Sequence, residues 1–213
     1  MRVERIVVGA LETNCYLICC DETEEAVVID PGADPERILR AVEEAGVHVA
    51  AIVNTHGHFD HIAANGPLKE ATGADVWVHP FDADMLTDGN LNGSALFFGL
   101  PRAVPPADRF LEDGDEVSCG KIAMKVIHAP GHSPGSVLLL AGGHIFCGDT
   151  LFRGSIGRWD LPGGSFEALI RSIRDRLLRL GDDIVVHPGH GSETTIGYER
   201  RYNPFLTDGT VLV

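Results

Sequence analysis

The chain has 213 residues, of which 44% are hydrophobic and 23% charged, and this composition is typical of one soluble globular domain, residues 1–213. Its formal net charge of −14 predicts that it binds neither nucleic acid nor an anionic membrane, since both repel an acidic protein. No apolar run approaches the ~20 residues of a membrane span, and the N-terminus lacks a signal-peptide core, so a cytoplasmic location is expected.

The N-terminal part of the chain predicts strands followed by one helix. Apolar runs predict three strands, Arg2–Val8, Asn14–Cys20 and Ala26–Ile29. Because only short turns link them, an antiparallel meander is expected. Asp34 is predicted to cap a helix that has Pro35 at its first position and ends at Gly46.

A histidine-rich turn, Thr-His-Gly-His-Phe-Asp-His, follows the strand predicted at Val49–Val53. Imidazole and carboxylate groups are ligands of borderline-soft divalent metals such as zinc. His56 and His58 are two residues apart, so they point to the same side of an extended segment. Asp60 and His61 follow at once and cannot share that direction. The turn therefore predicts two neighbouring metal ions rather than one.

The middle of the chain contains a long segment without a clear periodicity. It is preceded by a helix-like stretch, a strand and a short helix, predicted at Ile62–Ala71, Asp75–Val78 and Pro80–Thr87. The segment itself, Gly89–Pro106, carries the adjacent residues Phe97 and Phe98. Segments this long inside a domain are usually lids or binding loops. A packed surface loop whose phenylalanines join the core is an equal alternative.

The second half repeats the strand and helix pattern. Strands are predicted at Ile122–His128, Ser136–Leu140, His144–Cys147 and Ile184–Val186. Ser165 is predicted to cap a helix with an apolar stripe at helical spacing, formed by Phe166, Leu169, Ile170, Ile173 and Leu177. Periodicity alone therefore indicates a mixed α and β fold.

Three further candidate metal ligands lie just after predicted strands. They are His132, Asp149 and His190, and each lies beside a glycine in a short loop. Loops that follow strands commonly carry functional residues. Together with the histidine-rich turn, they complete a set of seven candidates.

The remaining histidines and the cysteines are assigned mostly structural roles. His48 and His144 are expected to be structural, whereas His128, His187 and Asp30 are candidates for orienting the metal ligands. The cysteines are expected to be reduced core residues, since no Cys-x-x-Cys pair occurs; they are Cys15, Cys19, Cys20, Cys119 and Cys147.

The motif His-x-His-x-Asp-His, followed by a separate His, Asp and His, resembles the metallo-β-lactamase-fold hydrolases. Gly148–Phe152 and Pro188–Gly191 resemble the glyoxalase II (hydroxyacylglutathione hydrolase) branch, and the tail from Thr194–Gly197 through Asn203–Leu206 resembles its short, single-domain members. The resemblance implies an α+β fold. In this four-layer αβ/βα sandwich, two mixed sheets carry helices on their outer faces.

The resemblance also implies a ligand set and a mechanism. One metal takes His56, His58 and His132, the other takes Asp60, His61 and His190, and Asp149 bridges them. The implied cofactors are two divalent ions, zinc first, with iron or manganese as alternatives. A hydroxide shared by the two ions would attack a thioester carbonyl, and Asp60 would orient it as a catalytic residue.

The implied substrate is a small-molecule thioester, S-D-lactoylglutathione, which is cleaved to D-lactate and glutathione. Arg158 stands at a basic, substrate-binding position of that branch, but Asp160 replaces its tyrosine, and its C-terminal helical domain is expected to be lacking. The run Gly157–Asp160 also resembles the persulfide dioxygenases, which use one iron. Cleavage of another ester or a lactone is a further alternative. The intact ligand set disfavours a metal-free domain that only binds a partner, and the oligomeric state is left open.

Overall fold

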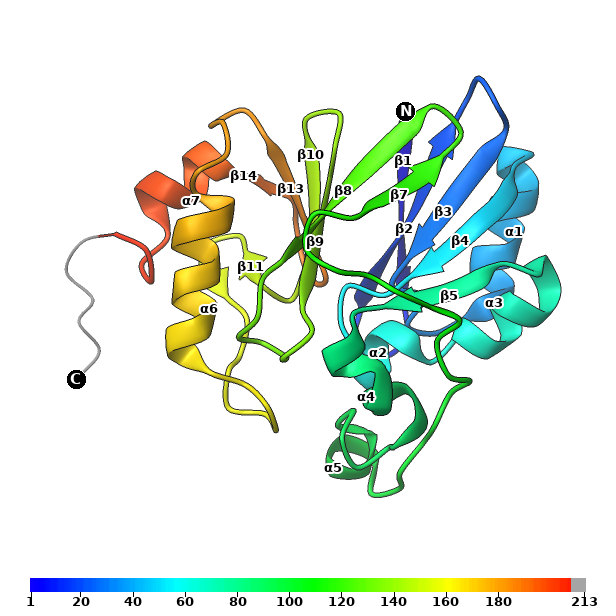
Figure 1. Ribbon diagram of the computed structural model, residues 1–213, viewed down its shortest axis with the longest axis horizontal. Coiled ribbons are helices and arrows are strands. Elements are labelled where there is room, and N and C mark those ends of the chain that lie inside the picture. Colours follow the sequence, from blue (N-terminus) through cyan, green and yellow to red (C-terminus); the bar gives the residue numbers. More distant parts are fainter. Residues whose placement is uncertain (208–213) are drawn as a thin grey trace.

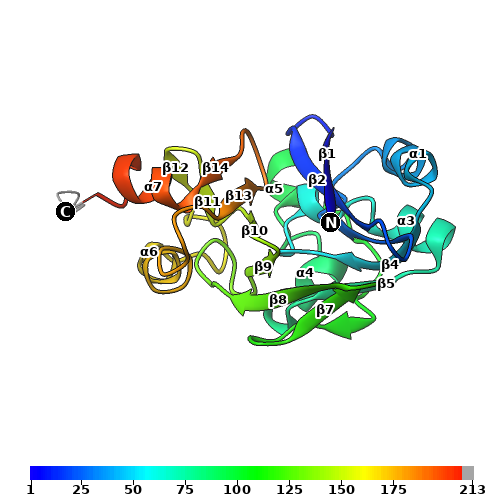
Figure 2. The same cartoon turned by 90° about the horizontal axis from the view of Figure 1, so that it is seen from above.

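Within residues 1–207, which the computed structural model describes, two six-stranded sheets face each other. Helices lie on the outer faces of both sheets, α1 and α3 on one flank and α6 and α7 on the other (Figures 1 and 2). This arrangement is the four-layer αβ/βα sandwich of the metallo-β-lactamase fold, as the sequence motifs implied. No helix in the described residues is long and apolar enough to cross a membrane.

The N-terminal sheet has the strand order β1-β2-β3-β4-β5-β6. Its strands are β1 (Arg2–Val8), β2 (Thr13–Cys20), β3 (Glu25–Ile29), β4 (His48–Val53), β5 (Asp75–Val78) and β6 (Arg109–Phe110). The pairs β1–β2 and β2–β3 are antiparallel, which confirms the predicted meander, whereas β3 to β6 pair in parallel.

The C-terminal sheet has the order β14-β13-β10-β9-β8-β7. Its strands are β7 (Glu116–Cys119), β8 (Ile122–His128), β9 (Val137–Ala141), β10 (His144–Gly148), β13 (Val185–Pro188) and β14 (Thr194–Thr195). All pairs are antiparallel except β10–β13. A separate small hairpin joins β11 (Leu151–Phe152) to β12 (Ser155–Ile156).

The helices differ from the sequence predictions at several points, and α5 and α7 have no predicted counterpart. They are α1 (Pro35–Ala45), α2 (Phe59–Ile62), α3 (Asn65–Thr72), the 3-10 helix η1 (Pro80–Asp82), α4 (Ala83–Thr87), α5 (Ser94–Phe98), α6 (Phe166–Ser172), the π-helix η2 (Ile173–Leu177) and α7 (Ile196–Tyr202). The stretch predicted as one helix from Ile62 is divided into α2 and α3, since Pro67 lacks the N–H that a continuous helix needs. The Asp34 side chain does not cap α1, because its Oδ2 accepts a hydrogen bond from Gly9 N instead (2.9 Å).

Strand alternation divides the apolar side chains among three core layers. In β2, Leu17 packs toward α1 and α3, whereas Tyr16 and Ile18 pack between the two sheets. The third layer lies between the C-terminal sheet and α6, η2 and α7, where Leu169 is fully buried. Because successive side chains of a strand point to opposite faces, a strand buried on both sides reads as a continuous apolar run.

A substitution of Phe146 tests how much the core layer between the two sheets contributes to stability. It is 1% exposed and lies between Tyr16 and His187, with ring centroids 5.2 and 4.7 Å away. Phe146→Ala is expected to lower the free energy of unfolding by about 4 kcal/mol, because the neighbouring rings cannot close the cavity. The matched control is Phe110→Ala, at a position 55% exposed, and urea unfolding is the measurement. Equal losses in both variants would contradict this core.

Candidate metal centre

All seven candidate ligands lie at one edge of the sandwich. The histidine-rich turn follows β4, and His132, Asp149 and His190 follow β8, β10 and β13. Strands β4, β10 and β13 each have parallel neighbours, and the carboxyl ends of parallel strands meet at the same edge of a sheet. Loops from both sheets therefore bring the candidate metal ligands together at one edge of the sandwich.

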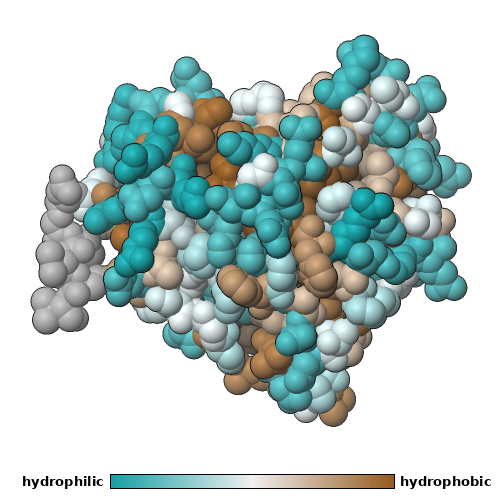
Figure 3. Space-filling model, viewed as in Figure 1, coloured by the Kyte–Doolittle hydropathy of each residue, from teal (hydrophilic) through white to brown (hydrophobic). Residues whose placement is uncertain are grey.

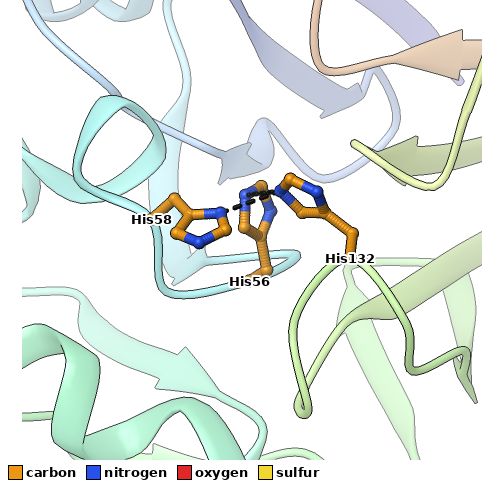
Figure 4. A group of neighbouring side chains, drawn as sticks. All are labelled: His56, His58 and His132. Carbon is orange, nitrogen blue, oxygen red and sulfur yellow. Dashed lines mark hydrogen bonds between the residues drawn. The ribbon is translucent and has the colours of Figure 1, made fainter. Parts of the chain in front are cut away.

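The first cluster consists of His56, His58 and His132, whose rings point toward one another (Figure 4). His132 Nε2 lies 2.8 Å from His58 Nδ1 and 3.2 Å from His56 Nε2. Three ring nitrogens thus surround one point. All three side chains are at most 5% exposed.

The second cluster consists of Asp60, His61 and His190. Asp60 Oδ2 lies 3.1 Å from His190 Nε2 and 3.5 Å from His61 Nε2. Asp60 and His61 belong to the first turn of α2. The two clusters adjoin, because the His61 ring centroid lies 4.2 Å from that of His56, and His56, His61 and Asp30 form a third, overlapping group.

Asp149 lies between the two clusters. Its Oδ1 is 3.4 Å from His61 Nε2, and its Oδ2 is 3.6 Å from both His132 Nε2 and His190 Nε2. One carboxylate therefore reaches a member of the first cluster and two members of the second.

Hydrogen bonds at the outer ring nitrogens orient most of these histidines. The Nδ1 atoms of His61, His132 and His190 contact Asp30 Oδ2, Arg158 O and Leu11 O at 3.0, 2.8 and 3.0 Å. Because these acceptors require N–H at Nδ1, the Nε2 lone pairs face the clusters. Such outer partners are how proteins orient histidine ligands of a metal.

The buried atoms of the clusters suit a divalent cation. His61 Nε2 and Asp149 Oδ1 are buried without a hydrogen-bond partner among residues 1–207. In each histidine and aspartate cluster the ligand atoms lie within 4.8 Å of one another. Buried polar groups without partners are costly, and neutral imidazole with carboxylate fits zinc, iron or manganese.

The electrostatics of the clusters favour the metal-binding protonation states of most members. Burial lowers the pKa of His56, and burial together with His132 lowers the pKa of His58 to about 3, so both rings are neutral. Burial raises the pKa of Asp149, but His61 and the other histidines outweigh it and keep that pKa below its usual range. For His61, burial lowers the pKa, but the surrounding carboxylates raise it by more, so the net pKa lies well above its usual value. A cation at this point would therefore compete with a proton.

Glycine beside the candidate ligands allows the loops to approach closely. A Cβ atom on Gly189 would lie 2.2 Å from Asp149 Oδ1 and 2.6 Å from His61 Cε1. Gly148 has a φ of +48°, and its Cβ atom would lie 2.2 Å from Thr55 Oγ1. Only glycine fits these two positions.

A pocket of about 210 Å³ opens onto the clusters. The loop before β6 contributes Phe97 and Phe98, which are 51% and 41% exposed and line the pocket instead of joining the core. The core-packing alternative for this loop is therefore wrong. Leu96 in α5 and Leu100 just after it are also exposed. Brown, hydrophobic surface is visible among hydrophilic residues at the bottom of the molecule (Figure 3).

The family model of the metallo-beta-lactamase superfamily matches residues 8–190. The chain belongs to this superfamily. It is 41% identical to hydroxyacylglutathione hydrolase GloC of Haemophilus influenzae, over 97% of this chain and 98% of that protein. The crystal structure of the BLEG-1 B3 metallo-beta-lactamase matches with a TM-score of 0.93 and 39% identity, over 97% and 100% of the two chains. The di-iron-bound form of TTHA1623 matches with a TM-score of 0.86 and 42% identity, over 96% and 100%.

Two buried aspartates tie the loops of this metallo-beta-lactamase superfamily member together. Asp30, predicted as an orienting residue, accepts hydrogen bonds from Thr55 N and Thr55 Oγ1 at 2.7 and 2.6 Å besides contacting His61. Sequence reasoning missed Asp82, at the end of η1. It accepts from Gly57 N, Ser133 Oγ and Gly135 N at 2.9, 2.6 and 2.6 Å, so it joins the histidine-rich turn to the His132 loop.

Arg158 lies in the wall of the pocket, but an aspartate engages its charge. Its Nε and a terminal nitrogen donate to the two oxygens of Asp160 at 2.8 and 2.9 Å. The residue that replaces the tyrosine of the glyoxalase II branch thus pairs with the predicted substrate-binding arginine. Both side chains are about half exposed.

The other histidines and the cysteines take mainly structural positions. His128 donates toward Pro134 O (2.9 Å) and stacks on His79, so it braces the His132 loop. His187 stacks on Phe146 and pairs with His144 and Glu193, away from the clusters. All five cysteines are free and buried, as predicted.

Asp82→Asn tests whether this carboxylate positions the loops. An amide cannot accept all three hydrogen bonds, so the free energy of unfolding is expected to fall by about 3 kcal/mol. The control is Asp84→Asn, two residues along at an exposed position, which should change it by less than about 0.5 kcal/mol. The measurement is urea unfolding of both chelator-treated variants. Matching midpoints would show that Asp82 does not hold the two loops together.

Proposed function

We propose that this chain is a metal-dependent hydrolase that cleaves a small thioester, with S-D-lactoylglutathione as the expected substrate. The observation that carries the proposal is the position of Asp149 between two ligand clusters that open into one pocket. The 41% identity to a hydroxyacylglutathione hydrolase over nearly the whole chain supports the choice of substrate.

The proposed ligand sets follow the clusters. His56, His58 and His132 would hold one divalent ion, and Asp60, His61 and His190 would hold the other, with Asp149 shared between them. Zinc is the first expectation, with iron or manganese as alternatives, since all three accept nitrogen and oxygen ligands. The 42% identity to a protein with a di-iron-bound form supports a count of two.

The chain's own groups have distinct parts in the proposed reaction. When bound, two divalent cations would polarise the thioester carbonyl and lower the pKa of a water molecule. Asp60 would orient that water as a catalytic residue, because Thr13 Oγ1 donates to Asp60 Oδ2 (3.2 Å) and fixes its rotamer. Phe59, Phe97 and Phe98 would shield the carbonyl from bulk solvent and so strengthen the electrostatic interactions.

Two other activities remain alternatives within this superfamily. A persulfide dioxygenase would hold one iron and consume oxygen, a reading based on the Gly157–Asp160 run. A hydrolase of another ester or a lactone would use the same two ligand clusters. Metal content, oxygen uptake and relative rates separate the three.

Asp149→Ala tests the shared ligand. The wild-type protein is expected to contain close to two transition-metal ions per chain, and the variant is expected to lose at least one, because the two cations would repel each other without a carboxylate between them. Hydrolysis should fall at least a hundredfold while the circular dichroism spectrum stays unchanged. Elemental analysis and a thioester assay are the measurements. A variant that keeps both metals and full turnover would show that Asp149 is only a turn residue.

The substrate assay compares S-D-lactoylglutathione with a lactone, a β-lactam and a phosphodiester. Loss of thioester absorbance is expected to be the fastest reaction of the metal-loaded protein. Arg158→Ala should raise KM only about two- to threefold and leave kcat unchanged, because Asp160 already engages the guanidinium. Much faster cleavage of the lactone or phosphodiester would overturn the thioester assignment. One iron per chain with oxygen uptake on a glutathione persulfide would favour the dioxygenase.

A further inference from the structure

A second pocket of about 250 Å³ adjoins the one at the metal centre. The two pockets share Leu11, Phe59, Asp60 and Phe98 in their walls. Small-molecule sites usually measure ~300–1,000 Å³, so neither pocket alone reaches this range, whereas the two joined do. The two adjoining pockets together have the volume of a site for a substrate with its reacting carbonyl at the clusters and its far end in the second pocket.

Arg102 forms part of the wall of this second pocket, and its guanidinium is held by aromatic rings. The guanidinium carbon lies 5.5 Å from the centroid of the Phe59 ring and 5.2 Å from that of Phe98. The two rings also contact each other edge to face, with centroids 5.3 Å apart. Stacking on aromatic faces restrains a guanidinium while its N–H donors stay available at the edge.

The backbone of Arg102 is fixed from below by two buried side chains. Its N–H donates to Ser94 Oγ (2.8 Å), and its carbonyl accepts from Asn92 Nδ2 (2.9 Å). Asn92 and Ser94 are 1% and 0% exposed. The long loop thus presents Arg102 from an anchored backbone, so little backbone entropy remains to be lost on binding.

The two arginines of the joined pockets differ in their partners. Arg158 makes its bidentate pair with Asp160, whereas Arg102 has no carboxylate within ion-pair distance in the described part of the chain. A guanidinium carries five N–H donors and matches a carboxylate in a two-pronged geometry. In a protein with a net charge of −14, an unpaired and restrained arginine beside a pocket suits an anion.

We propose that Arg102 binds a carboxylate at the end of the substrate remote from the scissile carbonyl, in the second pocket. The inference rests on the proposed function, because that function puts the carbonyl at the metal centre. It defines the substrate class as thioesters whose thiol half ends in a carboxylate. Arg102 then determines specificity through KM and takes no part in the chemical step.

The test uses two thioesters that differ in one group, S-acetyl-6-mercaptohexanoate and its amide, S-acetyl-6-mercaptohexanamide. The wild-type enzyme is expected to show a roughly tenfold higher kcat/KM for the carboxylate, mostly in KM. Arg102→Met keeps the apolar stem over the rings but removes the charge, so it should abolish this preference and leave the amide within twofold. Arg102→Lys should restore part of the preference.

The matched control is Arg109→Met. Arg109 also stacks on an aromatic ring, at 5.0 Å from the Trp77 centroid, but it lines neither pocket. This variant should retain the wild-type preference for the carboxylate. A preference that survives in Arg102→Met, or an equal loss on both substrates, would overturn the proposal.

A binding measurement separates this proposal from the proposed function. Calorimetry with 6-(methylthio)hexanoate and its amide, which cannot be hydrolysed, reports the carboxylate contact without turnover. If neither thioester is cleaved but the acid binds about tenfold more tightly than the amide, and only Arg102→Met removes the difference, thioester hydrolysis is wrong and the Arg102 site stands. If thioesters are cleaved but the acid and the amide bind alike, the Arg102 site is wrong.

Discussion

The crowding of ring nitrogens and carboxylate oxygens at one edge of the sandwich is the constraint on which the site depends. His132 Nε2 has two other imidazole nitrogens within 3.2 Å, and Asp149 lies within 3.6 Å of three histidines. Groups this close repel or compete unless their lone pairs converge on a cation. The structure meets this demand by fixing the far side of the rings, since backbone carbonyls and Asp30 hold the outer nitrogens.

Because the clusters draw on both sheets, the two halves of the sandwich must be held in register at this edge. Asp82 does this on one side by accepting hydrogen bonds from the turn after β4 and the loop after β8. On the other side, Tyr16 and Asn14 of β2 both donate to Pro188 O at the end of β13, at 2.7 and 2.9 Å. These buried hydrogen bonds cross between elements far apart in the sequence, which is why small shifts of either sheet would misplace the clusters.

The sequence revealed what is local and missed what is not. The candidate ligands stand out because each follows an apolar run, and Ser165 caps α6 as its position suggests. Asp82 reads as an ordinary residue in a short helix, because its partners are 25, 51 and 53 positions away. By the same local rules Asp34 is expected to cap α1, yet its carboxylate accepts a hydrogen bond from Gly9 N, 25 residues earlier, which no local pattern indicates. The layered architecture itself came from the family resemblance, since periodicity indicated only mixed α and β.

The contacts of the two pocket arginines also could not be predicted from the sequence. Sequence patterns identify arginines, but whether an arginine can bind a ligand depends on what already occupies its donors. Asp160 accepts two hydrogen bonds from the guanidinium of Arg158. The guanidinium of Arg102 instead stacks on the rings of Phe59 and Phe98, and its N–H donors stay available. The exposed phenylalanines of the long loop thus have a physical role. They line the pocket, and Phe98 restrains the guanidinium of Arg102. These contacts explain why the rings are exposed and do not join the core.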